Sequence, residues 1–240
     1  MGANEIIILS GALAGGYVTG LTGFGTGLTA LVFWLQVVPP IIAAPMVVIC
    51  SIVGQLQTLK AIWHHIDWHR VAPFIAGGLI GVPLGTLLLP LIDLRVFKLL
   101  VGGLLITYSL VMLANRSNPV ITWGGRTMDA IVGMGGGMLG GLAGLSGPLP
   151  TIWGSLKGWD KHRKRGLFQS FNLSILLFAA TSQAFSGFMT SEVGKWMIFA
   201  IPGTLAGAWL GRKTYDRLGE SRFNQIVLVL LILAGISILR

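Results

Sequence analysis

The chain has 240 residues, of which 53% are hydrophobic and only 10% are charged. A soluble globular domain carries about 25% charged residues, so this composition excludes that class and indicates a membrane protein. The net charge of +9 comes from basic residues in short linkers, where they set membrane orientation, and no nucleic-acid partner is expected. The single cysteine, Cys50, excludes a disulfide within the chain, and the scattered histidines give no metal-ligand spacing.

The sequence predicts eight hydrophobic segments separated by short linkers. No Lys, Arg, Asp or Glu occurs between Ile6 and Leu59, a stretch far longer than the roughly 20 residues that span a bilayer. The first and fifth segments are too long for one simple crossing. The charge-free runs lie at about 6–38, 41–59, 71–92, 99–115, 130–156, 166–191, 196–211 and 223–239.

Two glycine-rich stretches interrupt the two long runs, LTGFGTG at 21–27 and LAGLSGP at 142–148. A helix broken inside a bilayer leaves unpaired backbone groups, so the break must line protein or water. The half-helix that follows begins with free N–H groups and a positive dipole end. Thr22, Thr26 and Ser146 add hydroxyl donors, and Pro148 suits a first helical turn. Two such N-termini facing each other would form a neutral cradle for a small anion.

The glycines have a second interpretation, in which they only let helices pack closely, as small residues do in membrane helices. We favour the cradle for the two breaks and close packing for two other matching stretches. These are GVPLG at 81–85 and GAWLG at 207–211.

The sixth run contains a polar stretch, FQSFNLS, with Gln169 and Asn172 three residues apart. Residues at this spacing share a helix face, and buried amides are costly unless they are hydrogen-bonded. Their NH₂ groups could donate to the oxygens of an anion, or the two amides could simply join neighbouring helices.

All eight acidic residues lie at or near segment ends. Cation carriers and proton pumps usually keep a carboxylate in the membrane interior, so this placement favours an anionic or neutral substrate. Three histidines, His64, His65 and His69, surround Asp67 after the second run. They could form a proton-linked gate, but an interfacial segment with Trp63 and Trp68 is the simpler interpretation.

The chain reads as two repeats, 1–118 and 119–240. The two breaks align at an offset of 121 residues, and GVPLG aligns with GAWLG at an offset of 126, as Phe97 does with Phe223.

Basic residues at 157–165 and 212–222 are expected to form cytoplasmic loops. If runs one and five cross fully, 11 of the 17 Lys and Arg residues are cytoplasmic; if each folds back as a re-entrant hairpin, 13 are. The second arrangement, with inverted repeats, is favoured, and both arrangements place the termini outside.

No enzyme signature is present. The glycine-rich stretches are not followed by Lys-Ser/Thr and do not follow a strand, which excludes a P-loop and a Rossmann fingerprint. Neither a GxSxG nor an HExxH motif occurs. We therefore expect no catalytic residues, no cofactor and no resident metal.

With both breaks, the IDW at 66–68, GVPLG and the duplicated layout, the chain resembles the TauE/SafE family of sulfite exporters over essentially its whole length. That family has glycine-rich stretches closer to GFGGG and G(I/L)GGG, where this chain has GFGTG and GLSGP. The resemblance implies export of small sulfur oxyanions or organosulfonates across the bacterial inner membrane. Carried over by position, the implied site consists of Thr22, Gly23, Phe24, Gly25, Thr26, Gly27, Gly144, Leu145, Ser146 and Gly147.

The sequence thus predicts an all-α, multi-pass membrane protein that binds a small anion between two broken helices, with Gln169 and Asn172 as further donors. Transport by alternating access without ATP is expected, with a proton or sodium as a candidate coupling ion and a homo-oligomer as a candidate assembly. The alternatives are an anion channel, in which the breaks act as a selectivity filter, the import or export of another small organic anion, and a scaffolding membrane subunit.

Overall fold

The computed structural model describes residues 2–59, 68–114, 121–159 and 161–215, together with four residue pairs near the C-terminus. Its described residues form helices and connecting turns without strands, which confirms the all-α fold class. The helices are α1 (Ala3–Thr22), α2 (Thr26–Trp34), α3 (Pro40–Leu59), α4 (Trp68–Leu88), α5 (Leu94–Ala114), α6 (Gly125–Ala143), α7 (Pro148–Leu156), α8 (Lys161–Phe185) and α9 (Ser191–Tyr215), and a short 3₁₀ turn, η2 (Leu89–Leu91), follows α4.

The first long run folds back on itself at its glycine break. The Trp34 indole N–H donates to the backbone oxygen of Ile8 at 2.9 Å, and the Thr19 and Thr26 hydroxyls lie 2.6 Å apart. The first residue of α2 therefore lies beside the last turns of α1, and the last residue of α2 lies beside the early turns of α1, as in an antiparallel hairpin. Helix α2 runs back along α1, and its last turn lies beside the first turns of α1.

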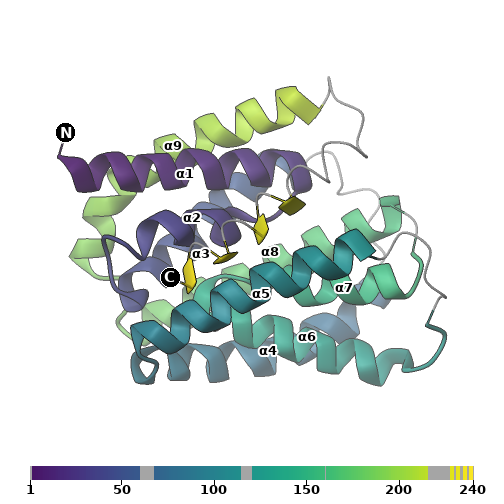
Figure 1. Ribbon diagram of the computed structural model, residues 1–240. Coiled ribbons are helices and arrows are strands. Elements are labelled where there is room, and N and C mark those ends of the chain that lie inside the picture. The colour runs from purple at the N-terminus through teal and green to yellow at the C-terminus, as the bar shows by residue number, and fades with distance from the viewer. Residues whose placement is uncertain are drawn as a thin grey trace.

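The second long run forms the same kind of hairpin. The Trp153 indole N–H, near the end of α7, donates to a carboxylate oxygen of Asp129, in the first turns of α6, at 2.7 Å. The two hairpins enter the molecule from opposite ends (Figure 1). Each long run is thus a helix followed by a shorter returning helix.

Glycines join each hairpin to one long helix from the other half of the chain. Helix α1 packs along α9, and α6 packs along α4. At Gly81 and Gly85 an added Cβ would collide with the backbone of α6, and at Gly207 and Gly211 it would collide with the backbone of α1. Only glycine permits this approach, so the close-packing interpretation of GVPLG and GAWLG is confirmed.

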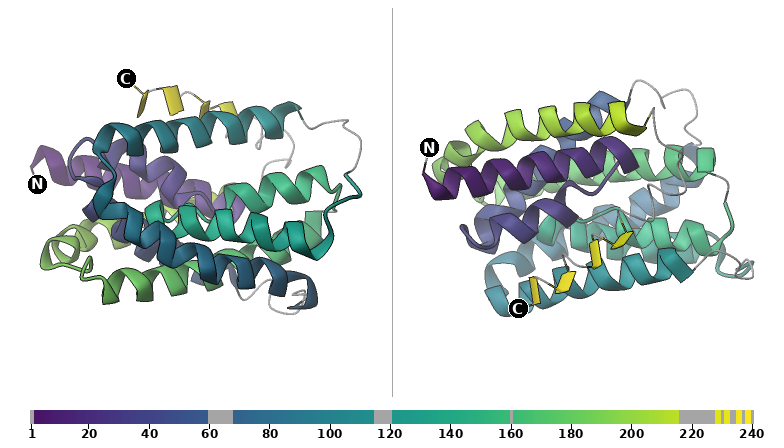
Figure 2. Two further views of the ribbon diagram at one scale, coloured as in Figure 1. Left: turned by 90° about the horizontal axis from the view of Figure 1, so that it is seen from below. Right: turned by 45° about the horizontal axis from the view of Figure 1, so that its top comes forward.

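Within the described residues, four helices are long and apolar enough to cross a membrane: Ala3–Thr22, Trp68–Leu91, Leu94–Ala114 and Ser191–Thr214. Large apolar side chains point outward from several helices, as they would toward lipid. On α5 they include Leu99, Leu100 and Leu110, and on α9 they include Ile198 and Trp209. Figure 2 shows α5 on the outside of the bundle, next to the C-terminal residues, where a Cβ at Gly102 would meet Ile238.

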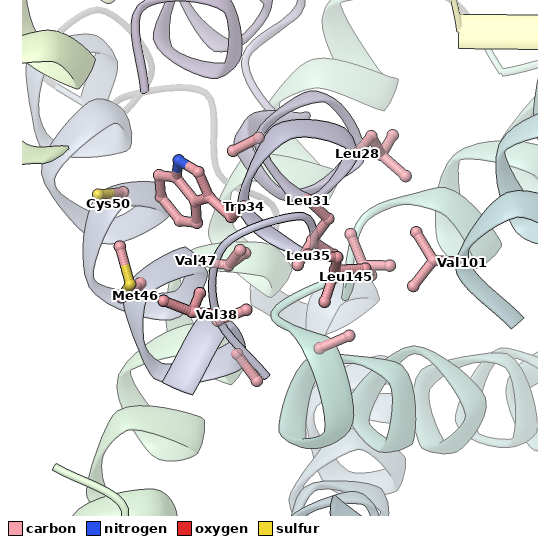
Figure 3. Close-up of a cluster of buried hydrophobic side chains, with 14 of the residues drawn as sticks. Leu28, Leu31, Trp34, Leu35, Val38, Met46, Val47, Cys50, Val101 and Leu145 are labelled. Carbon is pink, nitrogen blue, oxygen red and sulfur yellow. The ribbon is translucent and has the colours of Figure 1, made fainter. Parts of the chain in front are cut away.

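The core nearest the breaks is formed mainly by α2 and α3. Trp34 and Leu31 of α2 and Met46 of α3 are fully buried. Leu145, from the second break, lies in the same cluster, beside Leu35 (Figure 3). The second break is therefore packed into the half of the molecule that the first break belongs to.

The structure differs from the sequence prediction at the linkers. A loop was expected over 157–165, but the chain turns only around residues 157–159, and α8 begins at Lys161. Likewise Arg212 and Lys213 belong to the last turns of α9 rather than to a loop. Basic residues near a helix end are compatible with helical structure when they can extend toward the membrane surface, so the charge pattern made both helices too short, with α8 beginning late and α9 ending early.

Candidate functional site

The first break covers three residues between α1 and α2. Gly23 and Gly25 have φ angles of 85° and 115°, a region that only glycine adopts without strain. The Thr22 hydroxyl is held locally, since it donates to the backbone oxygen of Val18 at 2.9 Å and also contacts the backbone oxygen of Phe24. The break ends at the first turn of α2, where the N–H groups of Thr26, Gly27 and Leu28 have no partner within their own helix.

The second break covers residues 144–147 between α6 and α7. Gly144 has a φ of 68°, and its N–H and that of Leu145 close the end of α6 through bonds to Gly140 and Leu139. The first turn of α7 is poor in donors, because Pro148 and Pro150 have no N–H. A second helix thus begins after the break, as the sequence predicted, but among the first three residues of α7 only Leu149 has a backbone N–H.

The two breaks lie against each other. A Cβ at Gly147 would lie 2.8 Å from the Phe24 ring, and a Cβ at Gly27 would lie 2.7 Å from the Leu145 side chain. Phe24 also makes an edge-to-face contact with Tyr108 of α5, with ring centroids 6.0 Å apart. The two glycine stretches are thus in contact, as a cradle between them would require.

Helix α8 brings its two amides to the two breaks. The Gln169 side chain lies against the first break, because a Cβ at Gly23 would collide with its amide nitrogen. Asn172, one turn later, accepts a hydrogen bond from the Ser146 hydroxyl in the second break. The spacing of three residues therefore places one amide at each break, as a shared helix face requires.

Gln169 is buried, with 5% of its surface exposed, and both its amide nitrogen and its amide oxygen lack a hydrogen-bond partner. A buried polar group without a partner costs about 1–3 kcal/mol. Asn172 uses its carbonyl for Ser146, which leaves its N–H groups as the donors of that pair. These amides are the strongest indication of a ligand at this place.

The residues of the two breaks and the two amides of α8 are all neutral. Within the ranges that the structure describes, no group of three His, Cys, Asp or Glu residues could hold a metal ion. His69 contacts Arg126 at the start of α6, away from the breaks, whereas His64, His65 and Asp67 lie outside the described residues.

Two contributors to the site were not predicted from the sequence. Thr19 pairs with Thr26 across the hairpin, and the presence of a threonine on each side of the glycines is a signal that a re-entrant interpretation could have used. Tyr108, which contacts Phe24, lies on α5 in a run without any pattern that marks it.

Comparison with known proteins gives a consistent result. A family model described as "Sulfite exporter TauE/SafE" matches residues 7–238. A curated protein of Cupriavidus necator, named "Probable sulfite/organosulfonate exporter TauE", is 26% identical over 236 residues, which cover 94% of this chain and 90% of that protein. No solved structure matches the chain significantly.

Proposed function

The chain belongs to the TauE/SafE family of membrane transporters, and we propose that it exports a small sulfur oxyanion or organosulfonate across the bacterial inner membrane. The substrate binds where the two breaks meet, against the amides of Gln169 and Asn172. The relative from Cupriavidus necator, whose name states this substrate class, supports the proposal.

The observation that carries the proposal is the Gln169 amide, buried and without a partner beside Gly23. An oxyanion would accept hydrogen bonds from its nitrogen and from the free N–H groups of α2. Hydrogen bonds to a charged group are worth about 1.5–3 kcal/mol each. Neutral donors also leave binding weak enough for release, which a transporter needs.

The paired packing of the two halves supports alternating access. Helix α1 packs on α9, and α6 packs on α4, with the two hairpins entering from opposite ends (Figure 1). Inverted repeats would pack in this way, and in transporters built from them one bundle rocks against the other around a central site. The membrane potential favours anion efflux by about 2.3 kcal/mol per charge per 100 mV.

Flux of purified protein in liposomes tests the proposal. A panel of sulfite, sulfate, thiosulfate, sulfoacetate and small carboxylates should show saturable transport and counterflow for the sulfur anions, and the variant Gln169→Leu should lower that flux about 10- to 150-fold. Ser170→Ala is the matched control, because the Ser170 hydroxyl is buried on the same helix and donates to its own backbone at Gly166. Parent-rate flux in Gln169→Leu would refute the site, and flux without saturation or counterflow would indicate a channel.

The proposed orientation has a separate test. We assign the start of α8 and the end of α9 to the cytoplasm, because Lys and Arg are in excess in these two segments. A Lys161→Cys variant, in a Cys50→Ala background, should then resist a membrane-impermeant thiol reagent in intact cells and react after permeabilisation. Ready labelling in intact cells would reverse the topology.

A further inference from the structure

A second group of polar residues lies where α4, α6 and α8 meet, apart from the amides at the breaks. It consists of Thr86, Ser182 and Gln183, together with the backbone of Gly141. Thr86 and Gln183 are 1% and 0% exposed. The Ser182 hydroxyl donates to the Thr86 hydroxyl at 3.1 Å, and the Gln183 amide nitrogen donates to the backbone oxygen of Gly141 at 2.9 Å.

The orientation of the Gln183 amide follows from its partner. The Gly141 carbonyl can only accept a hydrogen bond, so the amide nitrogen faces it and the amide oxygen faces away. That oxygen is buried and has no hydrogen-bond partner. A hydrogen-bond acceptor that is fully desolvated and unpaired lowers the stability of the fold. It therefore needs either a hydrogen-bond donor or a cation.

Gly141 lies in the last turn of α6, just before the break. The last four carbonyls of a helix have no partner within it, and the helix dipole places negative charge there. The Thr86 hydroxyl oxygen is 3.0 Å from the place that a Cβ at Gly141 would occupy. The cluster therefore collects hydroxyl, amide and carbonyl oxygens at the negative end of a broken helix.

We propose that this cluster binds a sodium ion, with the Thr86 and Ser182 hydroxyl oxygens, the Gln183 amide oxygen and a carbonyl of the last turn of α6 as ligands. Carbonyl ends of broken helices commonly hold sodium in secondary transporters. None of these side chains ionises at physiological pH, so the cluster fits a metal cation rather than a proton. A hard cation prefers such oxygen ligands.

The site lies close to the anion cradle, since a Cβ at the neighbouring Gly140 would lie 3.2 Å from Ser146. A bound cation there would offset the charge of the anion and couple the two ligands. The binding of sodium stands on the cluster alone, whereas its coupling to transport rests on the proposed function.

Thermal melting of the purified protein tests binding without transport. At constant ionic strength, exchange of choline for saturating sodium should raise the melting temperature of the parent by roughly 3–10 °C, and potassium should have a smaller effect. Gln183→Leu and Thr86→Val should lose most of this shift. Thr181→Val, an exposed neighbour whose hydroxyl bonds to its own helix at Leu177, should keep it.

The outcomes separate the two proposals. A sodium shift that is equal in the parent, Gln183→Leu and Thr86→Val, or absent from the parent, overturns the sodium site, and anion flux in liposomes can still succeed. A shift that the two variants abolish supports the site even if no sulfur anion is transported, in which case the proposed function fails alone. Sodium-dependent anion flux that Gln183→Leu makes sodium-independent would establish coupling.

Discussion

The two breaks occupy equivalent positions in the two halves of the chain, but they differ in exposure and in donors. Residues 144–147 of the second break are all buried, whereas Thr22, Phe24 and Gly25 of the first are partly exposed. The first break leads into a helix with three free N–H groups, and the second into one whose first turn contains Pro148 and Pro150. The comparison teaches that two similar glycine breaks can differ in their donors, so in the proposed site the first break would be the donor-rich face and the second the closed wall.

Alanine at the first glycine of each break should separate the two roles with the largest effects. Gly144→Ala places a Cβ in a left-handed position, which costs about 1–2 kcal/mol, and within 3.2 Å of the Val47 Cβ, where overpacking adds about 1–3 kcal/mol. We expect a large loss of thermal stability. Gly23→Ala bears the same backbone cost but displaces the Gln169 amide, so its main effect should be on flux, about 10- to 150-fold.

Melting temperature and liposome flux, measured on both variants, check this expectation. Gly103→Ala is the control, because nothing lies within 4 Å of its added Cβ. A Gly23→Ala protein with parent flux would show that the first break does not contact the substrate.

The next comparison concerns the Ser146–Asn172 pair. Asn172→Ala removes amide donors and should lower anion flux about 10-fold or more. Ser146→Ala should instead act mainly on stability, by about 1–3 kcal/mol, because it leaves the buried Asn172 carbonyl without that donor. Measurements of anion flux and melting temperature on both variants distinguish these two roles. Equal flux losses would mean that the Ser146 hydroxyl itself binds the substrate, and a mild, substrate-independent loss in Asn172→Ala would indicate a helix–helix contact.

Much of this architecture follows from the sequence, because its signals are local. Glycine breaks in overlong apolar runs predicted the interruptions after Thr22 and Ala143, and the three-residue spacing placed Gln169 and Asn172 on one face. The packing role of GVPLG and GAWLG was also predictable, since small residues at helical spacing have few other uses in membranes.

Other features depend on contacts that no local pattern encodes. Which break each amide reaches is set by the packing of α8, which brings Gln169 to Gly23 and Asn172 to Ser146. The hydroxyls of Thr22 and Ser146 are engaged by protein acceptors. The donor poverty of the second break could have been predicted from Pro150, since PLP at 148–150 removes two N–H groups from one turn.

A smaller effect is expected from Phe24→Leu, which gives the first break the residue type that Leu145 supplies in the second. The edge-to-face contact with Tyr108 is worth about 0.5–1.5 kcal/mol, so the melting temperature should fall by a few degrees. Phe185→Leu, at a side chain that is 90% exposed, should leave it unchanged. An unaltered melting temperature in Phe24→Leu would show that the ring contact does not hold the first break in place.

The smallest expected effect is also the most direct test of the asymmetry. Pro150→Ala adds an N–H to the first turn of α7 and so makes the second break more like the first. A hydrogen bond contributes about 0.5–1.5 kcal/mol net, so the half-saturating concentration of the transported anion should fall about 2- to 10-fold. Pro39→Ala, at an exposed position before α3, is the control for loss of a proline. An unchanged half-saturating concentration, with folding intact, would mean that the start of α7 does not face the anion and that binding belongs to the first break and α8.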